Sequence, residues 1–175
     1  MFTIHKNPTI AFFIKAIVFY ISWFLVYELW LHPKGIFDAA VINNLVDSSS
    51  TLLKWFGFNL MPEPDSDNIR TIGIDGTHGV WIGDPCNGLT LFALFVGFII
   101  SFPGPIKHKL WYIPAGIILI HFLNILRIVA LSIISFKAPE LLSFNHTYTF
   151  TIIVYGIVFV LWMVWVNKFS KLEKK

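Results

Sequence analysis

Residues 84–102 read DPCNGLTLFALFVGFIISF, so a polar turn runs directly into a long apolar segment. This stretch contains Cys86, the single cysteine of the chain, which excludes a disulfide within the chain. The thiol is then either a small buried apolar side chain or a reactive group. The pattern predicts a helix beginning at Asn87, and the dipole of that helix would favour the thiolate form of Cys86.

Composition indicates the class of protein. The 175 residues are 56% hydrophobic and only 13% charged, and the mean hydropathy is +0.71. These values are typical of an integral membrane protein with a single membrane domain over residues 1–175. The net charge of +3 is small and its basic residues lie outside most of the apolar runs, which argues against nucleic-acid binding.

Four apolar runs predict four transmembrane helices, at about 10–31, 87–102, 110–136 and 148–166. A cleavable signal peptide is the alternative for the first run, but the run is longer than a signal core and lacks a small-residue cleavage site. The second run is short for a crossing. The third contains Pro114, for which a kink or a tilt is expected.

The segment 32–85 is too polar to cross a membrane and is predicted to lie outside it. Residues 36–58 mix apolar and polar side chains in the manner of an interfacial helix. Residues 69–75 and 78–82 alternate around Gly76-Thr77 and predict a β-hairpin. The fold class is therefore an all-α polytopic membrane protein with an interfacial helix and a small external hairpin.

Lysine distribution predicts the orientation of the chain. With four crossings both termini lie on one side, and the segments on that side are rich in lysine. The lysines concerned are Lys6, Lys15, Lys107, Lys109, Lys168, Lys171, Lys174 and Lys175. We expect both termini to be cytoplasmic, in a plasma (inner) membrane, with Cys86 facing outward.

Three polar residues are predicted to reach the same outer level. Arg127 lies 17 residues into the third run, roughly 25 Å from the inner face at about 1.5 Å per residue, and His146 precedes the fourth run. With Cys86 they offer a nucleophile, a proton carrier and a cation for an oxyanion, which is the chemistry of acyl transfer. The alternatives are a buried thiol, an interfacial histidine and a snorkelling or ion-paired arginine. The alternative is weakest for Arg127, because an arginine inside a span is energetically costly and usually functional.

At these residues the sequence resembles the exosortase and archaeosortase family of membrane transpeptidases. The match lies in Cys86-Asn87-Gly88-Leu89, in the NILRI stretch at 124–128 and in His146, and it covers about 72–166. The resemblance implies a cysteine transpeptidase or protease of short, core-only form, with Cys86, Arg127 and His146 catalytic and with Asn87 and Gly88 supporting them. It also implies exported substrates that end in a short motif, a transmembrane helix and a basic tail, which are sorted to the cell surface.

Several further expectations complete the prediction. Asn124, three residues before Arg127 on one helix face, is expected to orient the guanidinium. Cys86 and His146 are too few for a zinc site, so neither metal nor cofactor is expected. The acyl acceptor is left open between water and a lipid or glycan amine. The alternative function is a non-catalytic polytopic subunit of a transport or export complex, with Arg127 paired to a carboxylate of its partner.

Overall fold

The computed structural model describes residues 8–62 and 70–170 of the chain. Helix α1 (Pro8–Val26) continues through the π-helical turn η2 (Tyr27–Leu31) and the 3-10 turn η3 (His32–Lys34), and α2 (Ile36–Trp55) follows. Strands β1 (Thr71–Ile72) and β2 (Val80–Trp81) then lead through the 3-10 turn η4 (Asp84–Cys86) to α3 (Leu89–Ser101) and α4 (Ile106–Lys137). The described chain closes with η5 (Pro139–Leu141), α5 (Leu142–Phe144), η6 (Asn145–Thr149) and α6 (Phe150–Lys168).

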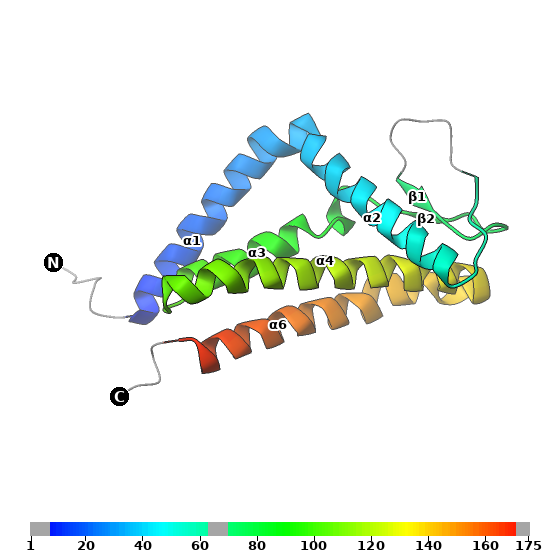
Figure 1. Ribbon diagram of the computed structural model, residues 1–175. Helices are drawn as coiled ribbons and strands as arrows, with labels where there is room; N and C mark the ends of the chain where they lie inside the picture. Colours follow the sequence, from blue (N-terminus) through cyan, green and yellow to red (C-terminus); the bar gives the residue numbers. More distant parts are fainter. Residues whose placement is uncertain (1–7, 63–69, 171–175) are drawn as a thin grey trace.

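Helices α3, α4 and α6 pack against one another and form the centre of the molecule. Figure 1 shows α1 leaning away from this group and meeting α2 at an apex, from which α2 descends toward the hairpin. Helix α1 contacts α3, whereas α2 contacts α4 and β1. The start of α1 and the end of α6 lie at one end of the molecule, and the hairpin lies at the other (Figure 1).

The helices confirm an all-α polytopic membrane protein. Three helical stretches of the described chain are long and apolar enough to cross a membrane: Pro8–Lys34, Ile106–Lys137 and Pro139–Lys168. Helix α3 is apolar but has only 13 residues, about 20 Å of helix against a hydrocarbon core of about 30 Å. That α3 crosses the membrane, and that the chain therefore has four spans, stays a prediction.

The predicted hairpin is confirmed, although its ladder is shorter than the alternating pattern indicates. The strands pair antiparallel, with Thr71 opposite Trp81 and Ile72 opposite Val80, and Ile74 forms a separate bridge with Leu60. Gly76 and Gly79 both have positive φ, the backbone conformation that glycine adopts most readily. The chain therefore leaves the ladder at these turns. Residue 69, the predicted start of the first strand, lies outside the described residues.

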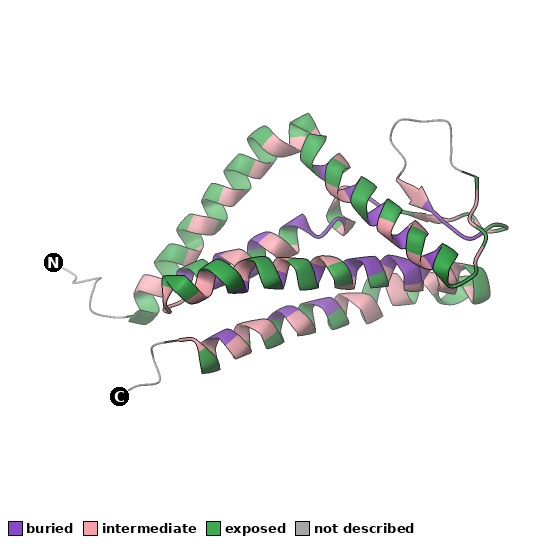
Figure 2. Ribbon diagram, in the orientation of Figure 1, coloured by how far each residue is buried: buried purple, intermediate pink, exposed green. Residues whose placement is uncertain are grey.

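Two hydrophobic clusters hold the helices together. One joins α2, the hairpin segment and the later half of α4, with Ile42, Leu45, Ile82 and Ile128 among its buried members. The other joins α3, α4 and α6 around the fully buried Phe95 and Trp165, among others. Figure 2 shows that burial is concentrated along the facing sides of these elements, while α1 is mostly exposed. The helix predicted over 36–58 is present as α2, which ends at Trp55, and its apolar face packs on α4 and β1. Its position along the membrane surface stays a prediction.

Two predicted helix starts are corrected. Helix α3 begins at Leu89 and not at Asn87, because Gly88 has a φ of 91° and a left-handed residue cannot continue a right-handed helix. The last span is predicted from sequence to start at residue 148, whereas the helical stretch that contains it begins at Pro139. His146 therefore lies within this stretch, in the π-helical turn η6, which runs directly into α6. Helix α4 continues as one helix through Pro114.

Gly116→Ala tests the packing of α4 on α3. A Cβ at Gly116 would overlap the ring of Phe95, and that ring is 0% exposed. We expect a loss of about 1 to 3 kcal/mol of stability, as for other overpacked cores. Thermal unfolding in detergent measures it. The matched control is Gly156→Ala in α6, where an added Cβ meets nothing within 4 Å; equal stability of the two variants would contradict the expectation.

Candidate active site

The turn η4 places Cys86 between the hairpin and α3. Gly83 precedes the turn in extended backbone, and the Cys86 N–H donates to the Gly83 carbonyl oxygen at 2.8 Å. The side chain of Cys86 is half-buried and packs against the cluster that contains Ile82 and Ile128. The thiol is therefore held by local backbone bonds on one side and by apolar packing on the other.

The histidine predicted from sequence lies beside this thiol. The Sγ atom of Cys86 is 3.6 Å from Nε2 of His146, within hydrogen-bonding reach for sulfur. The two residues are 60 positions apart in the chain, and the π-helical turn η6 carries the imidazole to this place. π-Helical turns occur frequently at functional sites. The arrangement permits proton exchange between thiol and imidazole.

Arg127 joins the pair in a narrow recess. Cys86, His146 and Arg127 line it together with β2 and with neighbouring residues of α4. Its cavity volume is about 10 Å³, which is roughly the space of one water molecule. No hydrogen bond or ion pair holds the Arg127 guanidinium within residues 8–62 and 70–170. A guanidinium has only hydrogen-bond donors. Because this one is half-buried and has no partner in the described part of the chain, it can donate several hydrogen bonds to an anionic oxygen.

Asn124 lies in the site in a different role from the predicted one. Its side-chain Nδ2 donates to the backbone carbonyl oxygen of Cys86 at 2.9 Å, and the residue is 1% exposed. The amide thus ties the turn of the thiol to α4, and it contacts the backbone of Cys86 where we expected it to orient Arg127. Asn87 is equally buried and Gly88 supplies the left-handed residue before α3.

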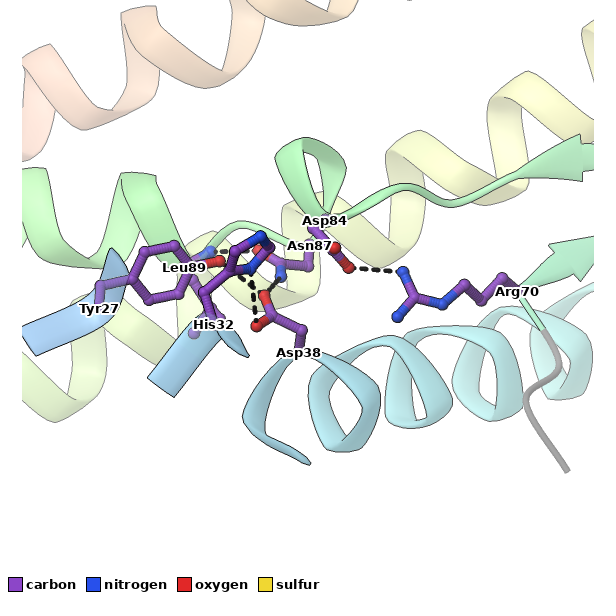
Figure 3. A network of polar contacts seen from close by, with 7 residues as sticks. All are labelled: Tyr27, His32, Asp38, Arg70, Asp84, Asn87 and Leu89. Atoms are coloured by element: carbon purple, nitrogen blue, oxygen red, sulfur yellow. Dashed lines mark hydrogen bonds and ion pairs between the residues drawn. The ribbon is translucent and has the colours of Figure 1, made fainter. Parts of the chain in front are cut away.

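The start of the hairpin is also linked to η4, the turn that carries Cys86. Arg70 donates from Nη1 to Oδ1 of Asp84 at 2.5 Å, and both side chains are partly exposed. Since Asp84 is the first residue of η4, this ion pair links the hairpin to the segment that carries Cys86 (Figure 3).

One polar residue beside the site was not singled out from sequence. Asp38 is 1% exposed and accepts a hydrogen bond from Asn87, the neighbour of Cys86 in the chain. A sequence signal for it exists. Asp38 shares one helix face with the other buried residues of α2, so it is an acid within a mostly apolar stripe. These residues are Ile42, Leu45, Val46, Ser49 and Leu53.

Metal chemistry finds no support among side chains in the described ranges. No group of three or more histidine, cysteine, aspartate or glutamate residues there could hold a metal ion. The expectation of neither metal nor cofactor stays a prediction.

A helical membrane protein that gathers a thiol, an imidazole and a guanidinium in one recess has the groups for cysteine-based acyl transfer. The chain belongs to the transmembrane exosortase family, whose sequence model (Exosortase EpsH) matches residues 9–168. The match extends beyond 72–166, the part on which the resemblance in sequence rested. Membership supports a membrane-embedded sorting transpeptidase at the level of the family. No curated protein and no solved structure matches the chain.

Proposed function

We propose that this protein is a cysteine transpeptidase or peptidase that cleaves C-terminal sorting signals of exported proteins through an acyl-enzyme on Cys86. The observation that carries the proposal is the 3.6 Å approach of Cys86 Sγ to His146 Nε2, in a recess that Arg127 also lines. A thiol activated by an adjacent base is the usual arrangement for cysteine nucleophiles.

In the acylation step, His146 Nε2 takes the thiol proton while Sγ forms a bond to the scissile carbonyl carbon. The carbonyl oxygen gains the negative charge, and Arg127 donates hydrogen bonds to it. The carbon–nitrogen bond then breaks, and the imidazolium returns its proton to the leaving amine. The product of this step is a thioester on Cys86 and a released C-terminal segment.

In the second step, an acceptor attacks the thioester, gives its proton to His146, and the carbon–sulfur bond breaks with the proton returning to the thiolate. The acceptor is water or an amine of a lipid or glycan. Substrates are exported proteins with a short C-terminal motif, a transmembrane helix and a basic tail. The segment after the motif would be retained in the membrane as the leaving group.

Trapping with hydroxylamine tests the acyl-enzyme. Membranes that contain the protein and an exported protein of the same genome with such a C-terminus are incubated with and without hydroxylamine. Hydroxylamine attacks thioesters, so we expect the cleaved protein to carry a C-terminal hydroxamate at the cut site, as detected by mass spectrometry. Cleavage that proceeds without any hydroxamate would contradict the thioester, and the Cys86→Ala protein is the negative control.

The proposed orientation places the reaction at the external face of the membrane, with both termini cytoplasmic. Reporter fusions after Lys109 are expected to read cytoplasmic and fusions after Gly57 to read external, because the lysine-rich short segments stay inside. Paired enzymatic reporters, each active on one side of the membrane only, make the measurement. An external reading after Lys109 would place the recess on the cytoplasmic side and contradict the proposed site of cleavage.

A further inference from the structure

Asp38 is a buried acid that the proposed reaction does not use. It lies in the first turn of α2 and its side chain is 1% exposed. Burying a carboxyl group away from water is costly unless donors satisfy it. The other buried residues on this face of α2 are Ile42, Leu45, Val46, Ser49 and Leu53, so packing alone would be served by an apolar side chain at 38.

The donors to Asp38 come from two separate parts of the chain. Its Oδ1 accepts a hydrogen bond from Tyr27 Oη at 2.7 Å and one from Asn87 Nδ2 at 2.6 Å. His32 Nδ1 lies 3.5 Å from Oδ2, without hydrogen-bond geometry. Figure 3 shows these side chains converging on Asp38 between the end of the first helical stretch and the turn that precedes α3.

Asn87 connects Asp38 to the segment that carries Cys86. Its Nδ2 is held by Asp38, while its Oδ1 accepts the backbone N–H of Leu89 at 2.9 Å. The donor Nδ2 and the acceptor Oδ1 are bonded to the same carbon in one plane, so fixing Nδ2 also fixes the direction of Oδ1. The bond to Leu89 closes the bend at Asn87 and Gly88, which directly follows Cys86, the last residue of η4.

The turn is thus held from two sides. On one side Asn124 of α4 donates to the Cys86 carbonyl oxygen, and on the other Asp38 of α2 fixes Asn87. We propose that Asp38 is a positioning residue for the nucleophile: by orienting the Asn87 side chain, it holds the Cys86 thiol at its contact with His146. The proposal rests on the proposed function and adds to it a residue 49 positions away from Asn87 in the chain.

Exchange of the two side chains tests the pairing. Asn87→Asp places two carboxyl groups at hydrogen-bond distance, and their repulsion should break the contact. The double variant Asp38→Asn with Asn87→Asp restores one amide and one carboxyl group with the roles reversed, and the new carboxyl oxygen can still accept from Leu89. We expect Asn87→Asp to lower the maximal rate of signal cleavage at least tenfold and the double variant to be at least fivefold faster than Asn87→Asp.

Two further variants define the role of the Asp38 carboxyl group as a hydrogen-bond acceptor. Asp38→Ala removes it and is expected to lower the maximal rate at least tenfold, with the half-saturating substrate level unchanged within twofold. Asp38→Asn keeps an acceptor oxygen and is expected to stay within threefold of wild type. The matched control is Asp47→Ala on the same helix, where the side chain is exposed; it should process normally.

The outcomes separate this proposal from the proposed function. Processing by Cys86→Ala would overturn the function itself. Loss of processing in Cys86→Ala, together with wild-type rates in Asp38→Ala and Asn87→Asp, would overturn only the role of Asp38. If Asp38→Ala does not accumulate in the membrane, the comparison of Asn87→Asp with the double variant decides. A double variant no faster than Asn87→Asp refutes the pairing.

Discussion

Cys86→Ala is expected to abolish signal cleavage while the protein still accumulates in the membrane. The substitution removes the only thiol of the chain and with it the covalent route through a thioester. We expect a rate at least 1,000-fold below wild type, on the order of 4 kcal/mol in transition-state free energy. The substrate should remain uncleaved with its C-terminal helix attached, as measured by the mass of the full-length protein in membranes.

The cost of this change to folding is expected to be small. Cys86 is half-buried and packs at the edge of an apolar cluster, and alanine removes a single sulfur atom there. The hydrogen bonds of the turn involve the backbone of Cys86 and would remain. Equal amounts of variant and wild-type protein in the membrane are therefore the control. Cleavage near the wild-type rate would make Cys86 structural and favour a non-catalytic subunit.

Arg127→Lys is expected to slow cleavage on the order of 100-fold, the typical cost of losing one well-placed oxyanion donor. The change keeps the positive charge but replaces the planar, forked set of guanidinium donors by a single ammonium on a flexible four-carbon side chain. Arg127 lines the recess beside Cys86 and His146. A misplaced donor at this position would therefore stabilise the negatively charged intermediate less well. The measurement is the initial rate of cleavage in membranes with matched enzyme levels.

The same variant distinguishes two roles for the charge. If Arg127 only pairs with a carboxylate, an ammonium can satisfy that pair and the rate should stay within twofold of wild type. Such a result would remove Arg127 from the catalytic group. Arg70→Lys is the matched control, because that guanidinium pairs with Asp84 outside the recess; we expect less than a threefold loss for it.

Local patterns predicted the class of fold and the place of the candidate site. The lengths of the apolar runs are a property of consecutive residues, and they indicate helices of membrane length without knowledge of packing. Helical rise placed Arg127 near the level of Cys86 and His146, and the structure brings the three to one recess. The hairpin followed from alternation around glycine-containing turns, which is again a local signal.

Other features required the tertiary structure. The start of α3 depends on the left-handed Gly88, which a hydropathy pattern does not reveal. The bond from Asn124 to Cys86 and the bond from Asn87 to Asp38 each join residues far apart in the chain. Periodicity shows which face of a helix is buried, but the partner that a buried polar group meets is decided only when helices pack. For this reason the sequence by itself determined the helices and pointed to Cys86, Arg127 and His146 as candidate site residues, whereas only packing decided what holds the turn at Cys86 in place.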